Sequence, residues 1–190
     1  MAVDFDNGSI NLPLQLPLHL PWQNNKQSLN VTAMLSPYLF DNYSLTAALK
    51  NACEQFSVQV LNNQQFPAPH FLAASFNEVQ PLWCREVLLQ CDGQNTVFAQ
   101  SWLNPAACHI GMDTIGETPL GEILFTDHSW QRGELEFFEI TGEALQQLAE
   151  HIGENLHWQH GVWARRSWFK NGAAKILVCE VFIAKQFYDD

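Results

Sequence analysis

Two charged side chains placed inside apolar segments are the residues of this chain most suited to chemistry. Glu180 interrupts the segment 176–183, in which all seven remaining residues are apolar. Such a run is typical of a strand that is buried on both faces. An unpaired carboxylate there would be costly, so the fold must supply a cation, a hydrogen-bonded ligand or a proton held by a raised pKa.

Arg85 poses the opposite problem in the segment 82–89. Strand alternation places its guanidinium on one face with Trp83 and Val87, which is an apolar setting for a permanently charged group. One buried cation and one buried anion on separate strands suggest a binding pocket. The alternative is that Arg85 and Glu180 pair with each other as a core salt bridge, and these residues alone leave both interpretations open.

The histidines and cysteines form no recognisable metal-binding or nucleophilic pattern. His151, His157 and His160 lie near one predicted helix end, but positions 151 and 157 fall on different helical faces and no further side chain completes a ligand set. The five cysteines are scattered without Cys-x-x-Cys spacing, which is typical of reduced thiols in a cytosolic core. No local signature supports a Cys–His nucleophile. We therefore expect no metal site.

Length and charge restrict the class of protein further. The 190 residues suit a single domain, and a net charge of −11 with only nine Lys and Arg argues against nucleic acid or an anionic membrane as partner. No apolar run approaches the ~18 residues of a membrane span, and Pro13, Pro17 and Pro21 break the opening apolar stretch, so no secretory signal is predicted. We expect a cytoplasmic monomer that binds a small molecule.

The elements that must position the two charges are two β-hairpins. Arg85 lies in a predicted strand that turns through Asp92-Gly93 into a second strand, and Glu180 lies in a hairpin that turns at Asn171-Gly172. Two hairpins make the sheet antiparallel. The predicted strands of these hairpins are 82–91 with 96–102, and 162–170 with 175–184.

The remaining segments predict helices around this sheet and an extended N-terminal arm. The fold class is therefore α+β, a single antiparallel sheet with helices packed on a face and at the ends, in one domain over residues 1–190. The further predictions are an arm over 1–30, a helix capped by Ser44 with an apolar stripe that reaches Phe56, a polar connection over 62–69, a strand over 71–76, a short helical or looped segment over 112–125, a strand over 134–140 and a helix opened by Thr141.

Four sequence blocks occur in an order that resembles the chorismate pyruvate-lyase family. They are WCREVLL with CDG at 83–93, GETPLG with LFT at 116–126, WARRS at 163–167 and EVF at 180–182. The resemblance covers roughly residues 35–187. It implies a chorismate lyase-like fold and a lyase that converts chorismate to 4-hydroxybenzoate and pyruvate, the entry step of bacterial ubiquinone synthesis, without metal or organic cofactor.

The family's ligand contacts carry over residue by residue. The arginine that binds the ring carboxylate falls on Arg85, and the glutamate that meets the ring hydroxyl falls on Glu180, which makes these two the catalytic candidates. Backbone contacts to the substrate fall on Leu120 and on Leu45, where some relatives have a methionine. The resemblance leaves open whether Glu180 moves a proton.

Two features of the chain depart from the family or leave a choice. The long connection from 127 to 161, with its extra amphipathic helix, leaves the shape of a lid and the rate of turnover open. Arg165 and Arg166 point to opposite faces of their strand, so at most one of them reaches the pocket and the other is expected to be a surface charge.

A binding protein without catalysis is the main alternative. It would be a small aromatic acid-binding module, either a carrier of 4-hydroxybenzoate or an effector-sensing domain of the kind found in certain bacterial transcription regulators. Such regulator domains normally follow a DNA-binding helix-turn-helix. The first 40 residues here are rich in proline and contain a single basic residue, Lys26, which argues against a regulator.

Overall fold

An antiparallel sheet of seven strands forms the centre of the protein. The computed structural model describes residues 12–78, 80–156 and 161–189. The strands follow the order β1-β2-β3-β7-β6-β4, and β5 pairs with β6 on the edge that β4 also occupies. The predicted α+β class with a single antiparallel sheet is confirmed. The strands are β1 (Phe56–Phe66), β2 (Leu82–Cys91), β3 (Gln94–Leu103), β4 (Gln131–Arg132), β5 (Glu136–Ile140), β6 (Val162–Asn171) and β7 (Ala174–Phe182).

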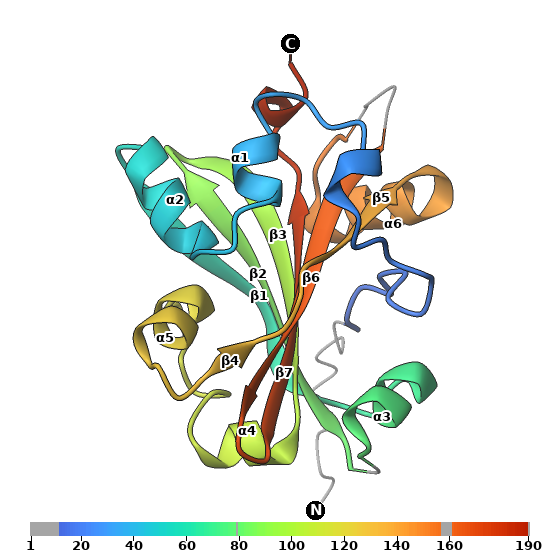
Figure 1. Cartoon of the computed structure of the whole chain (residues 1–190), viewed down its shortest axis with the longest axis vertical. Coiled ribbons are helices and arrows are strands. Elements are labelled where there is room, and N and C mark those ends of the chain that lie inside the picture. Colours follow the sequence, from blue (N-terminus) through green and yellow to red (C-terminus); the bar gives the residue numbers. More distant parts are fainter. Residues whose placement is uncertain (1–11, 79, 157–160, 190) are drawn as a thin grey trace, which may run out of the picture.

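Helices cover both faces of the sheet (Figure 1). One face, called the α2 face below, packs against α1, α2, α4 and α5. The other, the α6 face, packs against α3, α6 and the segment 14–22. The helices are α1 (Ser36–Leu39), α2 (Leu45–Ala52), α3 (His70–Phe76), α4 (Pro105–His109), α5 (Leu120–Thr126) and α6 (Gly142–Ile152), with short 3₁₀ turns at Lys26–Ser28 and Lys185–Phe187.

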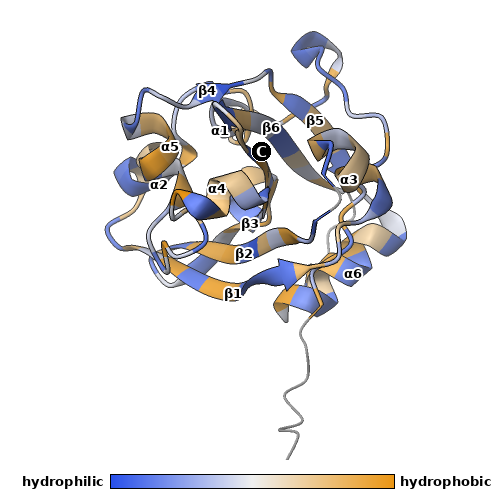
Figure 2. Ribbon diagram, turned by 90° about the horizontal axis from the view of Figure 1, so that it is seen from below, coloured by the Kyte–Doolittle hydropathy of each residue, from blue (hydrophilic) through white to orange (hydrophobic). Residues whose placement is uncertain are grey.

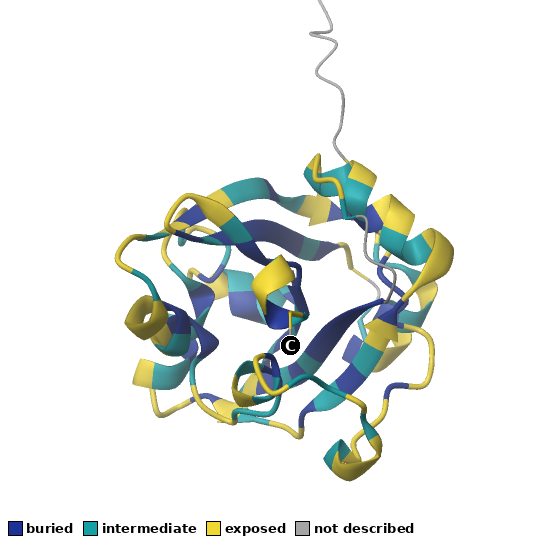
Figure 3. Cartoon of the chain, turned by 90° about the horizontal axis from the view of Figure 1, so that it is seen from above, coloured by how far each residue is buried: buried dark blue, intermediate teal, exposed yellow. Residues whose placement is uncertain are grey.

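Hydropathy and burial follow this layering. The ribbons of β1 and β2 carry both hydrophobic and hydrophilic colours in Figure 2, and β2 is buried along most of its length on both faces. In Figure 3 the central strands are mostly buried, whereas the outer turns of the helices are exposed. Charged residues inside these strands are therefore enclosed by protein.

Both predicted hairpins are confirmed, with one shift at the second turn. In the first hairpin Asp92 and Gly93 have positive φ values of 51° and 78°, as a type I′ turn requires. In the second, Asn171 pairs with Ala174, so the turn residues are Gly172 and Ala173, one position later than expected. This shift changes which β6 residue lies opposite each residue of β7.

Two predicted segments were wrong. Residues 71–76 form helix α3 rather than a strand, because Leu72 and Phe76, four positions apart, bury the same helical side. The polar segment that begins at residue 62 was predicted as a connection, but most of it belongs to strand β1. This strand begins at Phe56, which was predicted to lie on the preceding helix. A polar sequence is acceptable in β1 because it is the edge strand of the sheet.

The helix starts follow the predicted caps. Ser44 Oγ accepts a hydrogen bond from Ala47 N at 3.3 Å, which confirms it as the cap of α2. Thr141 occupies the cap position of α6, although its side chain makes no capping bond. Both helices thus begin where the sequence indicated.

The described part of the N-terminal segment runs along the α6 face without regular structure as far as residue 22. Leu14, Leu16 and Leu18 are buried in the core of that face, and Gln23 forms a β-bridge with Phe137. Residues 1–11 of the predicted arm lie outside the described residues. Within the described ranges no helix is long and apolar enough to cross a membrane.

Candidate active site

Strand register places Arg85 in a row of small side chains on the α2 face. Arg85 lies opposite Ser101, Ser101 opposite Val178, and Val178 opposite Ser167. Residues directly opposite each other in antiparallel strands point to the same face. The row therefore runs across β2, β3, β7 and β6 with one long cationic side chain at one end.

Glu180 lies in the adjacent row of the same face. It is opposite Ala99 on β3 and Arg165 on β6. Arg85 and Glu180 are thus two strands and two residues apart, which corresponds to a Cα separation of roughly 12 Å. Both sequence-predicted charges point to one side of the sheet, and only small residues stand between them.

Arg165 compensates the charge of Glu180. Its Nε donates to Glu180 Oε2 at 2.6 Å, and its Nη1 donates to the carbonyl oxygens of Tyr38 and Asp41 at 2.7 and 2.8 Å. The Arg165 side chain is 1% exposed and that of Glu180 is 16% exposed. The salt bridge between Arg85 and Glu180, which the sequence left open, is not formed. Glu180 Oε1 has no hydrogen bond from any described residue.

Arg85 is buried with part of its hydrogen-bonding capacity unused. Its side chain donates only through Nη2, to the carbonyl oxygens of Gly116 at 2.9 Å and Thr118 at 3.2 Å. Among the described residues, Arg85 Nε is the one buried side-chain nitrogen or oxygen without a partner. Burial lowers the pKa of Arg85 to about 10, so the group remains charged at neutral pH. An unsatisfied buried donor costs about 1–3 kcal/mol, a cost that an anionic ligand would remove.

The region between these charges is partly open to solvent. Val178 and Glu180 keep intermediate exposure although β7 is at the middle of the sheet. The buried residues of the α2 face form two separate clusters, one against α1 and α2 and one against α4 and α5. We call the polar residues on this part of the α2 face the polar belt: Arg85, Ser101, Arg132, Arg165, Ser167 and Glu180.

Arg132 joins the polar belt from the edge strand β4 and was not predicted from the sequence. Its Nε donates to Ser167 Oγ at 2.9 Å and its Nη1 to Asn42 O at 3.0 Å. Its guanidinium carbon lies 5.3 Å from the centre of the Phe125 ring and 5.5 Å from that of Phe169. Burial lowers the pKa of Arg132 to about 10. No local sequence signal marks Arg132, because it stands between Gln131 and Gly133 and interrupts no apolar run.

The polar belt concentrates positive charge in an acidic protein. Three arginines and one glutamate give it a net charge of +2, whereas the whole chain carries −11. Arginine forks bind carboxylates in two parallel hydrogen bonds. The belt is therefore suited to a small anion, and most suited to one with two negative charges.

The starts of two helices meet beside Arg85. Leu45 and Leu120 are the first residues of α2 and α5, and the first N–H groups of a helix have no acceptor within it. The carbonyls that hold Arg85 belong to the turn that leads into α5. A Cβ atom on Gly121 would lie 2.9 Å from Thr46 Oγ1, which shows how closely the two starts approach. All four predicted site residues are thus on elements that converge.

Gly121→Ala should separate these two helix starts. The added methyl group meets the side chain of Thr46, which is 4% exposed and has little room to move. Overpacking of this kind costs roughly 1–3 kcal/mol, measurable as a lower denaturation midpoint in urea. Adding Thr46→Ala should restore most of the loss, and Gly133→Ala, whose methyl group meets nothing closer than 3.6 Å, should be milder. Equal midpoints for Gly121→Ala and wild type would contradict the close packing.

Arg166 points to the α6 face, as alternation requires. It pairs with Glu136 through Nε at 2.9 Å, donates to Leu18 O at 2.6 Å and lies 4.6 Å from the centre of the Trp22 ring. The expectation of a surface charge was wrong, because the side chain is 15% exposed and fully engaged in packing. Arg165 is the one of the two that reaches the polar belt.

A second buried carboxylate, Glu86, was missed in the sequence. It lies on the α6 face with no exposed side-chain surface, and accepts hydrogen bonds from Leu14 N and Gln100 Nε2 at 2.8 Å. His151 Nε2 lies 3.1 Å from its other oxygen. His151 is therefore tied to a structural carboxylate, whereas His157 and His160 lie outside the described residues. No group of three or more potential metal ligands occurs in the described ranges.

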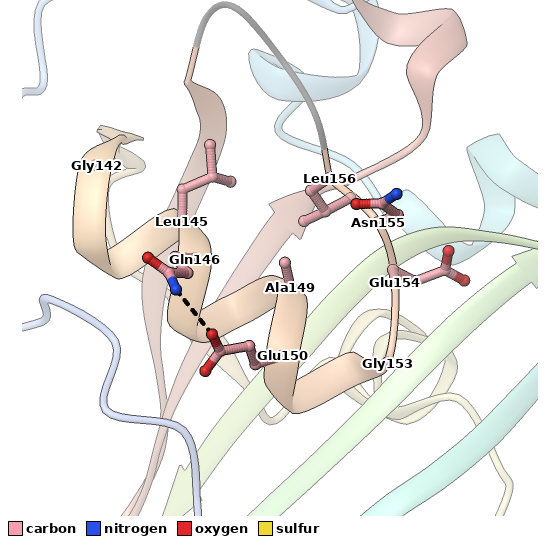
Figure 4. Close-up of a pocket in the computed structure, with 9 residues that line it drawn as sticks. All are labelled: Gly142, Leu145, Gln146, Ala149, Glu150, Gly153, Glu154, Asn155 and Leu156. Atoms are coloured by element: carbon pink, nitrogen blue, oxygen red, sulfur yellow. Dashed lines mark hydrogen bonds between the residues drawn. The ribbon is translucent and has the colours of Figure 1, made fainter.

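A surface hollow of about 780 Å³ lies along α6 (Figure 4), the helix that packs on the other face of the sheet from the polar belt. Among the described residues that line it, the charged ones are Glu150 and Glu154, and none is Lys or Arg. Anionic ligands are repelled by such a lining. The polar belt is therefore the better candidate for an anion site.

Comparison with known proteins adds sequence evidence to this geometry. The family model for chorismate lyase matches residues 16–190. A protein of Pseudoalteromonas translucida named "Probable chorismate pyruvate-lyase" is 36% identical over 177 residues, with 87% of this chain and 93% of that protein covered. A protein of Shewanella amazonensis with the same name is 34% identical, with 78% of this chain and 79% of that protein covered.

Comparison of structures shows a shared fold with regulator domains. The effector domain of PhnF from Mycobacterium smegmatis matches with a TM-score of 0.52 at 15% sequence identity, over 75% of this chain and 90% of that domain. At this identity the likeness concerns the arrangement of the strands and helices alone.

Proposed function

Because the chain belongs to the chorismate lyase family, we propose that it is a chorismate pyruvate-lyase, which converts chorismate to 4-hydroxybenzoate and pyruvate. One observation carries this proposal beyond the family match. Arg85 Nε and Glu180 Oε1, a buried donor and a carboxylate acceptor, both lack partners among the described residues, and the two side chains lie on the same face of the sheet. They match the two ends of a ring that carries a carboxylate opposite a hydroxyl group.

In the proposed complex the ring carboxylate binds at Arg85. Arg85 Nε donates to one of its oxygens, and the first backbone N–H groups of α2 and α5, at Leu45 and Leu120, add donors beside it. The ring hydroxyl donates to Glu180 Oε1. Arg165 holds Glu180 through the other oxygen, so the carboxylate is fixed in orientation.

The reaction is an elimination that the chain's own residues assist by position and charge. The ether bond between the ring and the enolpyruvyl oxygen breaks, and its electron pair leaves with that oxygen. The hydroxyl-bearing carbon loses its proton and the ring becomes aromatic, while the enolpyruvate gains a proton to give pyruvate. Atoms and electrons balance without an added oxidant or reductant. The protein's share is orientation of the ring and stabilisation of the developing negative charge.

The biological setting belongs to the same proposal. We place the reaction at the entry to ubiquinone synthesis, carried out in the cytoplasm by a monomer that consists of one domain and needs no metal or organic cofactor. What supports this setting is the family, together with the acidic composition of the chain.

Turnover separates an enzyme from a binding module. Purified protein mixed with chorismate should form 4-hydroxybenzoate, followed by absorbance, and pyruvate, followed by reduction with lactate dehydrogenase, in equal amounts. The rate should be unchanged after treatment with EDTA. Tight binding of 4-hydroxybenzoate without formation of pyruvate would instead identify a non-catalytic module, and loss of turnover on chelation that metal restores would contradict the cofactor-free reaction.

A further inference from the structure

The proposed binding mode leaves one charged group of the substrate without a partner. Chorismate carries a second carboxylate on its enolpyruvyl side chain, and the product 4-hydroxybenzoate lacks it. We propose that Arg132 binds this second carboxylate, so that the site favours the dianionic substrate over the monoanionic product. This inference rests on the proposed lyase function.

Arg132 and Arg85 reach the same row of small side chains from opposite directions. Arg132 pairs in register with Phe169, so its side chain points to the α2 face. Its Nε is bonded to Ser167, which closes the row that begins at Arg85. The two arginines, on β2 and on β4, therefore lie on either side of Val178.

The guanidinium of Arg132 is held in place but not fully used. The rings of Phe125 and Phe169 lie against it, and Asn42 O and Ser167 Oγ occupy Nη1 and Nε. Nη2 makes no hydrogen bond to any described residue. A donor that is fixed in direction and left without a partner is suited to a carboxylate.

The chemistry of the substrate selects this arginine rather than Arg165. In chorismate the enolpyruvyl group is attached to the carbon next to the hydroxyl-bearing carbon, so its carboxylate must lie at the Glu180 end of the ring. Arg165 is also at that end, but the Glu180 carboxylate already compensates its charge at 2.6 Å, whereas Arg132 forms no salt bridge with any described residue. Burial lowers the pKa of Arg132, Arg165 lowers it further, and Glu180 and Asp41 raise it, so Arg132 lies among these charged groups.

The loop between α1 and α2 links the two arginines. Arg165 donates to the carbonyl oxygens of Asp41 in the loop and of Tyr38 at the end of α1, and Arg132 donates to the carbonyl oxygen of Asn42. This loop leads directly into the start of α2, where Leu45 is placed to contact the ring carboxylate. Binding of the second carboxylate at Arg132 would thus fix the same loop that completes the rest of the site.

Arg132→Gln should separate the affinities for substrate and product. Charge-assisted hydrogen bonds are worth about 1.5–3 kcal/mol, so KM for chorismate should rise about 10- to 100-fold. The Kd for 4-hydroxybenzoate, followed by tryptophan fluorescence, should change by less than about threefold because the product has no second carboxylate. Arg132→Lys should give an intermediate KM, because it keeps the charge but not the fork.

Two results would overturn the inference. One is an unchanged kcat/KM for chorismate in Arg132→Gln, and the other is an equal loss of affinity for chorismate and 4-hydroxybenzoate, which a structural role predicts. If Arg132→Gln does not fold, Arg132→Lys tests the inference by the same ratio, its affinity for chorismate relative to its affinity for 4-hydroxybenzoate. If the wild-type protein binds chorismate without turnover, the proposed function fails, and the ratio of the two Kd values still tests Arg132. The matched control is Arg166→Gln on the α6 face, which should leave this ratio unchanged.

Discussion

Arg85→Ala is expected to lower kcat/KM for chorismate on the order of 1,000-fold. Truncating one partner of a buried, hydrogen-bonded charge pair costs about 2–5 kcal/mol, and every 1.4 kcal/mol is a factor of ten. The described structure offers no second cation at this end of the polar belt, where the carbonyls of Gly116 and Thr118 surround the guanidinium. Affinity for 4-hydroxybenzoate should fall with the activity, because product and substrate share the ring carboxylate.

The fold of Arg85→Ala should survive. The variant loses two hydrogen bonds to carbonyl oxygens but also removes a desolvated charge with an unsatisfied Nε, so the free energy of unfolding should change by less than about 2 kcal/mol. Arg85→Lys should recover only part of the activity, since an ammonium group cannot bind a carboxylate through two parallel bonds. Wild-type kcat/KM in Arg85→Ala would rule out the proposed carboxylate site.

Glu180→Gln is expected to lower kcat/KM on the order of 100- to 1,000-fold. The amide cannot replace the charged acceptor for the substrate hydroxyl, and a positioned acid or base contributes roughly 10²- to 10⁴-fold in comparable sites. The pairing with Arg165 also makes this variant less stable than wild type, because the amide oxygen still accepts from Arg165 Nε but leaves a buried cation uncompensated. The free energy of unfolding should therefore fall by about 1–3 kcal/mol, less than the cost of breaking such a pair completely.

Glu136→Gln is the matched control for this variant. Glu136 on β5 pairs with Arg166, the neighbour of Arg165 on β6, but on the opposite face of the sheet. It should lose stability in thermal melts yet keep wild-type kcat/KM per folded molecule. If Glu180→Gln is destabilised but binds 4-hydroxybenzoate and processes chorismate as well as wild type, Glu180 is only the structural partner of Arg165.

Much of the sheet could be predicted because its turns carry strong local signals. Asp92-Gly93 fixed one hairpin and the Asn171-Gly172 sequence located the other to within one residue. Edge strand β1 was missed because its side chains are mostly polar, and helix α3 was mistaken for a strand because six residues are too few to reveal a period. Local sequence therefore predicts paired strands better than short elements at the periphery.

The pairing of Glu180 shows why a one-residue difference at a turn matters. A turn centred on Asn171-Gly172 would place Trp163 opposite Glu180. The observed turn at Gly172-Ala173 places Arg165 there instead. A shift of one residue at the turn moves the partner by two residues, and the partner of the central carboxylate depends on it.

Arg132 could not be found from the sequence for a different reason. It belongs to a strand of two residues, and the groups that bury it, Phe125 and Phe169, come from a helix and from another strand. Arg85 and Glu180 were found because each interrupts an apolar run of its own. Charges that are enclosed only by tertiary packing leave no such mark.

A crystal structure of the complex with 4-hydroxybenzoate tests the proposed site most directly. The ligand should lie on the α2 face with its carboxylate within hydrogen-bonding distance of Arg85 Nε and its hydroxyl within hydrogen-bonding distance of Glu180 Oε1, while Arg165 keeps its bond to Glu180 Oε2. Binding in the hollow along α6, or in the polar belt with the carboxylate directed at Arg165 and the hydroxyl at Arg85, would contradict the proposed roles of these residues.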